Sequence, residues 1–576
     1  MWPFTPSNVP VIEAKRAERA RALESAGVDS PTSDHAQYFG ATATQIVARI
    51  QAGEWTASQV LEAYIARAVF AHSKTNCLTE VFFERARKQA KELDAEFAAT
   101  GKLRGPLHGV PISIKDQFEI EGIDTTIGFT QWANKPAAKN ADLINTLLSA
   151  GAILYVKTNI PQTMLAFECS NPLWGRSLNP YSALYTSGGS SGGEGALLAM
   201  DGSALGIGSD VGGSLRIPAA YCGVYALKPA HGRISYVGAR GPVSGFDGVK
   251  SGAGPMGRSM DDITMLAKVL FGKQGAQRDV APAPFREVEI PKKLKFGYYT
   301  SDGFIKASPA CKRAVLETVD ALRKEGHECV EISLPDTSIA TNLFVGLTSA
   351  DGYKTLLSHL GPDKKEGALF LVTLGPRLPW FVRSIAGWVL ESVVGDKIFA
   401  SALRASRVKS VTEYWALASQ RDAFIRDWYS QVWDKYSLDG IIAPVQAVPQ
   451  LPHGGCDNYS ALATGTFLYN ILDMPAGSLP ATRVDPTKDA ITEDWAKEEG
   501  HGSKVFEKGI FYGPKKLYDP ELSKGMPVSV QVIGKKWEDE KVLGMMKVVD
   551  DALQGSHKDR NFGPGAWDRY QASLEK

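Results

Sequence analysis

The chain has 576 residues, of which 44% are hydrophobic and 22% are charged, a composition typical of a soluble globular protein. Lysine and arginine total 64 and aspartate and glutamate 63, so the net charge of +1 gives no reason to expect nucleic acid or a strongly acidic partner. The length allows two or three average domains, or one large α/β domain with additions.

Six scattered cysteines without a Cys-x-x-Cys pair favour reduced thiols in an intracellular protein over a disulfide framework. The start MWPFTPSNVP lacks the parts of a signal peptide, and no apolar window of about 18 residues predicts a membrane span. We therefore expect a cytoplasmic protein. No His/Cys cluster has the spacing of metal ligands, and we expect neither a metal nor another cofactor.

The N-terminal part of the chain is rich in helix-forming residues. Residues 10–30 predict a solvated helix within an N-terminal extension, 1–35. Residues 41–100 read as helical throughout, with Thr56 or Ser58 as the cap before an apolar run.

A change of pattern follows at residue 108. HGVPISIKDQFEI (108–120) and GAILYVKTN (151–159) are short apolar runs bounded by Gly, Pro and Asn, which predict buried strands. The amphipathic segment 141–151 lies between them and ends at a glycine, so the region is predicted to be a strand–helix–strand unit.

Strands and helices alternate in the second half of the chain. Further strands are predicted at 294–300, 329–335, 440–445 and 527–534, and helices at 311–326 and 541–555. No internal repeat or long linker interrupts residues 36–576. We interpret them as a single α/β domain with a large mixed β-sheet core covered by helices on both faces.

One segment, 367–397, differs from the rest because it is apolar and aromatic with only five charged residues. Its bulky aromatic residues are Phe370, Trp380, Phe381 and Trp388. Pro376 and Pro379 predict that it forms two short helices. The segment is interpreted either as a buried helical hairpin or as an apolar cap, at about 367–400, that makes peripheral membrane contact or covers an oily channel.

The stretch GGSSGG (188–193) fits several loop types by composition. The apolar run EGALLAM after it argues against a flexible linker. A P-loop requires lysine where Glu194 stands, and a carboxylate there would repel phosphate. A nucleophile elbow matches G-x-S-x-G literally, but no apolar strand precedes the stretch and no histidine follows in a recognisable context.

A second Gly-Gly-Ser loop follows an apolar run that ends at Asp210. Successive N–H groups around paired glycines can form a concave nest for a negative oxygen, and a serine at its edge, Ser214, can attack a carbonyl. Such a serine needs a base. Lys115 stands at the polar end of an apolar strand, where loss of hydration lowers the pKa of an amine.

These motifs resemble those of the amidase signature family, whose defining text is a lysine in (S/A)-I-K-D, then GGSSGG, then D-x-G-G-S-x-R-x-P. All three occur here in order, as SIKD (113–116), GGSSGG (188–193) and DVGGSLRIP (210–218). The resemblance is contiguous over 155–229 and extends more loosely over 40–560. Later text such as YNILDMPAGSLPATRV looks most like the branch of fatty acid amide hydrolases and fungal acetamidases. The resemblance implies the amidase signature fold and the hydrolysis of carboxylic amides to an acid and an amine or ammonia.

The resemblance also implies roles for particular residues. It places Ser214 as the nucleophile, Ser190 as a bridging serine and Lys115 as the base of a Ser-Ser-Lys triad that works through an acyl-enzyme. The implied oxyanion hole consists of the backbone N–H groups of Val211, Gly212, Gly213 and Ser214. The implied supporting residues are Asp210 and Arg216, with Met164 beside the acyl site and Ser191 ordering the glycine loop.

Several functions fit these motifs. A hydrolase of hydrophobic or fatty acyl amides is favoured by the apolar segment 367–397, and a small-amide acetamidase is the alternative in which that segment packs internally. A subunit of a tRNA-dependent amidotransferase is disfavoured by the neutral charge, and a non-catalytic scaffold by the three intact triad positions. We expect a small-molecule amide as partner and no nucleic acid, and the resemblance suggests a homodimer.

Overall fold

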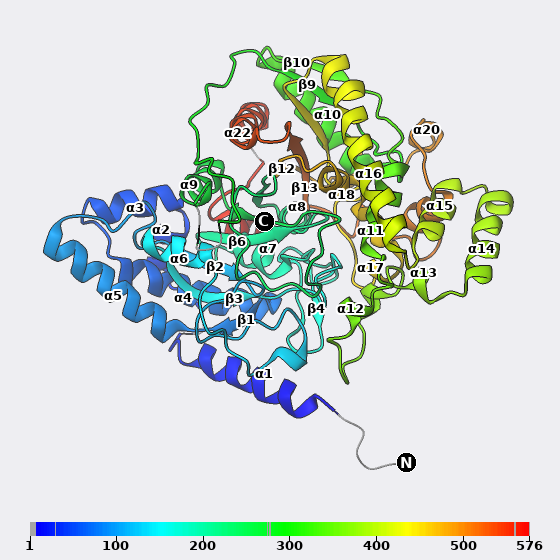
Figure 1. Cartoon of the computed structure of the whole chain (residues 1–576). Coiled ribbons are helices and arrows are strands. Elements are labelled where there is room, and N and C mark those ends of the chain that lie inside the picture. Colours follow the sequence, from blue (N-terminus) through cyan, green and yellow to red (C-terminus); the bar gives the residue numbers. More distant parts are fainter. Residues whose placement is uncertain (1–6, 29, 274, 276–277, 558–559, 575–576) are drawn as a thin grey trace.

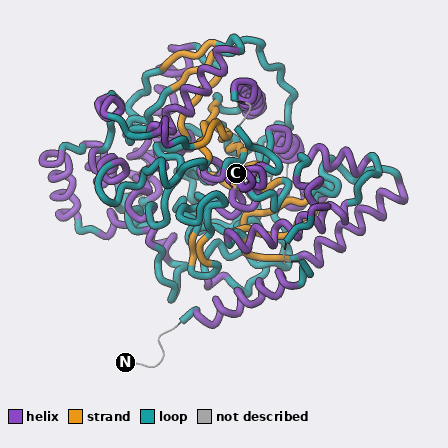
Figure 2. The backbone as a smooth tube through the Cα atoms, turned by 180° about the vertical axis from the view of Figure 1, so that it is seen from behind, coloured by secondary structure: helices purple, strands orange, loops and turns teal. Residues whose placement is uncertain are grey.

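A computed structural model of the protein describes residues 7–28, 30–273, 275, 278–557 and 560–574 (Figure 1). Its centre is an 11-stranded sheet in the order β1-β3-β2-β6-β8-β7-β12-β13-β11-β9-β10. Seen from opposite sides in Figures 1 and 2, helices surround the strands. The sheet is mixed, as predicted, because β2 runs parallel to both β3 and β6, whereas β6 and β8 are antiparallel.

The strands are β1 Leu78–Val81, β2 Pro111–Lys115, β3 Ile153–Thr158, β4 Ser170–Asn171, β5 Gly175–Arg176, β6 Leu205–Asp210, β7 Tyr225–Lys228, β8 Gly252–Gly257, β9 Lys295–Tyr298, β10 Glu328–Glu331, β11 Gly440–Pro444, β12 Ala476–Arg483 and β13 Pro527–Ile533. The α-helices up to residue 324 are α1 Val9–Glu24, α2 Ala36–Phe39, α3 Ala43–Gln51, α4 Ala57–Thr75, α5 Phe83–Thr100, α6 Asp142–Ser149, α7 Gly192–Ala199, α8 Arg216–Cys222, α9 Met260–Leu270 and α10 Pro309–Lys324. Those that follow are α11 Ser338–Thr348, α12 Lys354–Leu357, α13 Leu374–Arg377, α14 Trp380–Trp388, α15 Lys397–Ala405, α16 Val411–Trp428, α17 Cys456–Tyr459, α18 Thr464–Ile471, α19 Pro486–Asp489, α20 Glu493–Lys497, α21 Lys504–Phe511, α22 Asp539–Ser556 and α23 Ala566–Leu574.

The predicted N-terminal helix is α1, although part of the predicted extension, residues 1–6 and 29, lies outside the described residues. Its description as a solvated helix is wrong at Lys15, which is buried. The Lys15 ammonium lies 3.0 Å from a carboxylate oxygen of Glu80 and 3.2 Å from one of Asp124. The charge of Lys15 therefore did not predict its exposure. Carboxylates from other parts of the chain pair with the ammonium and offset the cost of burying it.

Residues 41–100 are less uniform than predicted. Thr56 caps α4, as expected, by accepting a hydrogen bond from the backbone of Gln59. The prediction of helical text throughout is wrong at β1, which pairs antiparallel with β3. Its residues, LTEV, include two β-branched side chains that suit a strand, and four residues are too few to show a period in the sequence.

The segment 367–397 contains α13 and α14, which Pro379 separates, and a π-helical stretch, Val389–Val394. The interpretation as a buried hairpin is wrong for α14, whose side chains Trp380, Phe381, Ile385 and Trp388 are 73%, 51%, 60% and 58% exposed. Figure 1 shows α14 at the periphery of the molecule. Among the described residues, no helix is long and apolar enough to span a bilayer.

Candidate active site

Lys115 is the last residue of β2 and is completely buried. Its Nζ lies 2.7 Å from Ser190 Oγ and 2.8 Å from Ser209 Oγ, within hydrogen-bond distance of both. Loss of hydration by burial lowers the pKa of Lys115 to about 7, although the carboxylate of Asp210 opposes this change. A large fraction of the lysine is therefore neutral near pH 7 and able to accept a proton.

The two glycine–serine loops lie next to each other. The peptide bond between Gly189 and Ser190 is cis, and the following Ser191 N–H donates to the carbonyl oxygen of Ser214 at 3.2 Å. The structure thus brings together Lys115, Ser190 and Ser214, which are far apart in the sequence. Ser214 is 8% exposed, and it lines a cavity.

Asp210 organises the second loop from the end of β6. Its carboxylate accepts hydrogen bonds from the backbone N–H groups of Gly213 at 2.7 Å and Leu215 at 3.2 Å. It also accepts two from the guanidinium of Arg216, each at 3.1 Å. Although burial acts in the opposite direction, Arg216 holds the pKa of Asp210 well below its usual range. A buried, ionised carboxylate with these partners fixes the backbone around Ser214.

Three of the four N–H groups expected to form the oxyanion hole have no acceptor among the described residues, namely those of Val211, Gly212 and Ser214. The fourth, that of Gly213, already donates to Asp210. Gly213 has φ +125°, and a β-carbon there would clash with the side chain of Thr466. Thr466 Oγ1 in turn donates to the carbonyl of Gly212 at 2.7 Å, so both sides of this loop are held in place.

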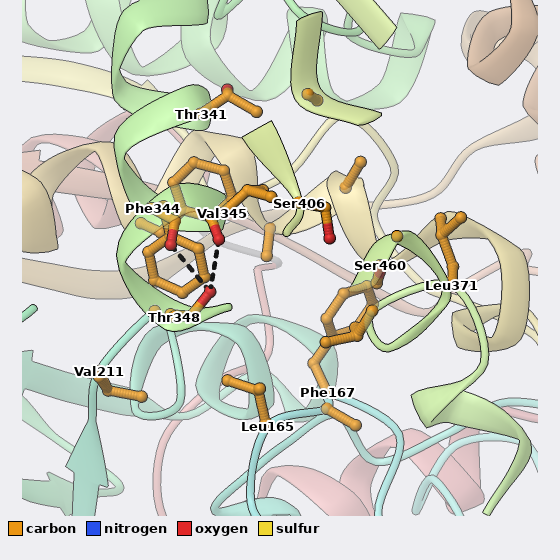
Figure 3. A pocket seen from close by; sticks show the side chains of 18 of the residues that line it. Leu165, Phe167, Val211, Thr341, Phe344, Val345, Thr348, Leu371, Ser406 and Ser460 are labelled. Atoms are coloured by element: carbon orange, nitrogen blue, oxygen red, sulfur yellow. Dashed lines mark hydrogen bonds between the residues drawn. The ribbon is translucent and has the colours of Figure 1, made fainter. Parts of the chain in front are cut away.

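A mainly apolar cavity has Ser214 in its wall. Figure 3 shows other side chains that line it. Met164, the residue expected beside the acyl site, is part of its wall. The rings of Phe344 and Phe467, which also line it, stack with centroids 4.4 Å apart. Further lining residues come from the predicted cap segment, from α15 and from the residue that follows α15, namely Leu371, Val372, Leu374, Gly375, Phe399, Ala402, Leu403 and Ser406. The chain around α14 therefore has both an exposed apolar helix and an inner wall of the cavity.

A family model named Amidase matches residues 59–543. The chain belongs to the amidase family. An acetamidase from Aspergillus oryzae (strain ATCC 42149 / RIB 40) is 31% identical to this amidase over 541 residues, which cover 92% of each chain. Fatty-acid amide hydrolase 1 from Sus scrofa is 31% identical over 543 residues, which cover 93% of this chain and 89% of that protein.

A solved structure of a fatty acid amide hydrolase superposes on this amidase with a TM-score of 0.78 at 29% identity. The superposition covers 96% of this chain and 91% of the other. The predicted amidase signature fold is thereby confirmed, and so is the assignment of the chain as an amide hydrolase. The residue roles implied by the resemblance are proposals, because these comparisons match chains and folds rather than functional groups.

Sequence reasoning missed two residues near Lys115. Ser209 contacts the lysine directly, and Gln117 contacts it through Ser209. Ser209 Oγ donates a short hydrogen bond to Gln117 Oε1, and Gln117 Nε2 donates to Tyr236 OH at 2.8 Å. The amide oxygen of Gln117 can only accept, so Ser209 uses its hydroxyl proton there and must accept from Lys115. With these donor and acceptor roles, Ser209 does not use the lone pair of a neutral Lys115, and this lone pair can accept a hydrogen bond from the Ser190 hydroxyl. The available signal was the position of Gln117, two residues after the lysine and on the adjoining turn.

Glu194 was considered in the sequence only as an argument against a P-loop. In this amidase it is fully buried and accepts hydrogen bonds from Ser113 Oγ at 2.6 Å and Thr158 Oγ1 at 2.9 Å. Burial raises the pKa of Glu194 to about 8. These bonds attach α7, which follows the first glycine–serine loop, to β2 and β3. Within the described ranges, no group of three or more His, Cys, Asp and Glu side chains is arranged to hold a metal.

Proposed function

We propose that this amidase hydrolyses hydrophobic carboxylic amides, with a long acyl chain in the cavity, through an acyl-enzyme formed on Ser214. The observation that carries the proposal is the contact between Lys115 and Ser190, which places a lysine of lowered pKa behind a serine hydroxyl in the loop next to Ser214. The apolar cavity at Ser214 supports the choice of substrate.

In the acylation step, Ser214 Oγ adds to the carbonyl carbon of the amide. Its proton passes to Ser190 Oγ, and the proton of Ser190 passes to neutral Lys115. The carbonyl oxygen becomes an oxyanion, which would bind to the N–H groups of Val211, Gly212 and Ser214, the three without an acceptor among the residues described. Each such donor contributes about 3 kcal/mol to transition-state stabilisation in other acyl-transfer enzymes.

Breaking the C–N bond requires the proton to return. The Lys115 ammonium gives it back through Ser190 to the leaving nitrogen, which departs as a neutral amine or ammonia rather than as an anion. Water then attacks the Ser214 ester by the same relay, and the carboxylic acid is released. The lysine thus acts as a base and then as an acid, so its loss should impair amide hydrolysis more than ester hydrolysis.

The cavity favours long over short acyl groups. Acetamide would contact only a small part of the apolar wall, whereas a long acyl chain would contact much more of it. A small-amide activity remains the alternative because a fungal acetamidase is as similar to this chain as a fatty-acid amide hydrolase. An amidotransferase role would require glutaminase activity that a partner and tRNA stimulate.

Peripheral membrane contact is proposed for α14. Its exposed aromatic side chains, next to the basic Arg377 and Arg383, suit the interface between lipid headgroups and acyl chains. A homodimer and a cytoplasmic location stay predictions, the former testable by sedimentation velocity of the purified chain.

The test is the hydrolysis of primary amides from acetamide to octadecanamide, with labelling by a fluorophosphonate probe. We expect kcat/KM to rise with acyl length, and we expect Ser214→Ala to lose both labelling and hydrolysis. Ser191→Ala removes the neighbouring hydroxyl and should retain far more activity than Ser190→Ala. A rate that peaks at acetamide would refute the long-chain substrate. Persistent labelling or hydrolysis in folded Ser214→Ala would refute the nucleophile.

A further inference from the structure

The cavity wall is not uniformly apolar, because it contains hydroxyl groups without a hydrogen-bond partner in the described ranges of the chain. Thr341 is 3% exposed, and its Oγ1 is buried without a hydrogen-bond partner among the described residues. Ser406 is 7% exposed. The hydroxyls of Ser406 and Ser460 have no hydrogen-bond partner within the described part of the chain, but unlike that of Thr341 they are not fully buried. All three residues line the cavity.

These hydroxyls lie away from the end of the cavity where bond cleavage is proposed. In the view of Figure 3, Ser406 and Ser460 lie on the side opposite Phe344 and Thr348. Val211, which precedes the proposed nucleophile by three residues, lies at the lower left of this view, and the two serines lie away from it on the right. A chain that starts at Ser214 and crosses the cavity would therefore reach the two serines at some distance from its carbonyl carbon.

A plain hydrocarbon chain would fit such a wall poorly. In the free protein, water can satisfy hydroxyls that face the cavity. A hydrocarbon chain would displace this water and leave each hydroxyl buried without a partner, which is an unfavourable state. A chain that carries an oxygen atom at the right position would replace the lost hydrogen bond.

We propose that the preferred amide carries a hydroxyl or carbonyl group part-way along its acyl chain, where Ser406 and Ser460 hydrogen-bond to it. The inference rests on the proposed function, since it assumes that the acyl chain occupies this cavity. Serine hydroxyls both donate and accept, so they suit either oxygen function. Ser406 and Ser460 act here on substrate choice and take no part in the proton relay.

The test compares octadecanamide with a series of monohydroxyoctadecanamides that differ only in the position of the hydroxyl. The measured quantity is the ratio of kcat/KM for each hydroxylated amide to that for octadecanamide. In a wholly apolar cavity this ratio is below one at every position, because the hydroxyl loses its hydration. We expect one or more positions near mid-chain where the ratio is about five or more, corresponding to one satisfied buried hydroxyl.

The double variant Ser406→Ala/Ser460→Ala should lose this preference, with a ratio about five-fold lower or less than one. Thr348→Val is the matched control. Thr348 lines the same cavity, but its hydroxyl already donates to the carbonyl of Phe344 at 2.8 Å and approaches that of Val345 at 3.3 Å (Figure 3). Its removal should leave the ratio between the two substrates unchanged.

Calorimetric binding of the same amides to Ser214→Ala separates this inference from the proposed function. If no amide is hydrolysed but hydroxylated amides bind more tightly and the double variant abolishes the difference, the cavity preference holds and the proposed reaction fails. The inference is overturned if octadecanamide is preferred at every hydroxyl position. It is also overturned if the double variant Ser406→Ala/Ser460→Ala, folded as judged by its melting temperature, keeps the wild-type ratio of kcat/KM values.

Discussion

The acid–base behaviour of Lys115 depends on its surroundings more than on its chemistry as a lysine. It is buried at the end of β2 and has two serine hydroxyls within 2.8 Å, but no carboxylate forms an ion pair with it among the described residues. Burial without an ion pair favours the neutral amine, which is the form that the proposed relay through Ser190 requires.

The first prediction concerns the pH dependence of catalysis. The pKa of Lys115 is lowered to about 7, so below this pH the protonated lysine cannot act as a base. We expect kcat/KM for amides to fall about ten-fold per pH unit below pH 7 and to reach a plateau above about pH 8. Lys115→Ala should lose several orders of magnitude of amidase activity and this titration with it. A profile that stays flat from pH 5.5 to 8 would contradict the role of the lysine.

The second prediction concerns Gln117, whose amide oxygen sets the direction of the Ser209 hydroxyl. In Gln117→Leu this hydroxyl can donate to the lone pair of Lys115 and compete with Ser190. We expect kcat for amides to fall about ten-fold, the effect of roughly one misdirected hydrogen bond, while KM changes little.

Gln117→Glu serves as the comparison, because it keeps an acceptor for Ser209 but adds a negative charge near Lys115. We expect it to retain more activity than the leucine variant and to move the midpoint of the pH profile upward, since the charge favours the ammonium. A purely structural role for Gln117 would lower activity in both variants and leave the midpoint where it is.

At the level of elements, α14 combines an exposed apolar face with a position next to the cavity wall. We expect Trp380→Ser/Trp388→Ser to weaken binding to phosphatidylcholine vesicles in a flotation assay by ten-fold or more, because burial of each indole in the interface is lost. Trp537→Ser, which removes a partly exposed tryptophan from outside the cap segment, is the control and should bind as the wild type does. Equal vesicle binding by the wild type, Trp380→Ser/Trp388→Ser and Trp537→Ser would contradict the proposed membrane contact of α14.

The elements also show which features the sequence could predict. Strands β2, β3 and β13 were predictable because their apolar residues are contiguous and bounded by turn residues. Strand β8, GAGPMG, was not, because its glycines resemble a loop. One of them, Gly254, is needed because a β-carbon would strike the backbone of Leu227 in the neighbouring strand.

The same contrast holds in the site. Lys115, Ser190 and Ser214 stand in distinctive local motifs, and the structure brings them together. Ser209, Gln117 and Thr466 were not singled out, because their importance lies in contacts with distant residues that a single sequence does not reveal. The exposure of α14 was equally undetermined, since an apolar segment reads the same whether it is buried or exposed.

At the scale of the whole molecule, Arg216 connects the site to the C-terminal part of the sheet. Besides Asp210, its guanidinium donates to the carbonyl of Thr466 at 2.9 Å, to Asn470 at 2.7 Å and to Gln531 at 3.1 Å. These partners lie on α18 and β13, more than 200 residues further along the chain. Folding of the C-terminal region therefore completes the support of the loop that carries the proposed nucleophile, Ser214.

We expect Arg216→Met to lower the free energy of unfolding at pH 7 by about 3–5 kcal/mol, because it leaves Asp210 buried and unpaired. Thermal denaturation measures this loss. The pKa of Asp210 is below its usual range in the folded protein, so the stability that the pair provides is present at neutral pH and lost as the solution is acidified through that lowered pKa. The difference between the two proteins should therefore shrink in strong acid. A difference independent of pH would point to lost packing instead.

The position of α14 beside the cavity wall has a consequence for enzyme kinetics. If α14 holds the enzyme at a bilayer, as proposed, the enzyme would meet a lipid-like amide at the density that the amide has in that surface. Adding inert lipid at a fixed amount of substrate would then dilute the amide in two dimensions and slow turnover, although its bulk concentration is unchanged. Water-soluble amides would show no such surface dilution.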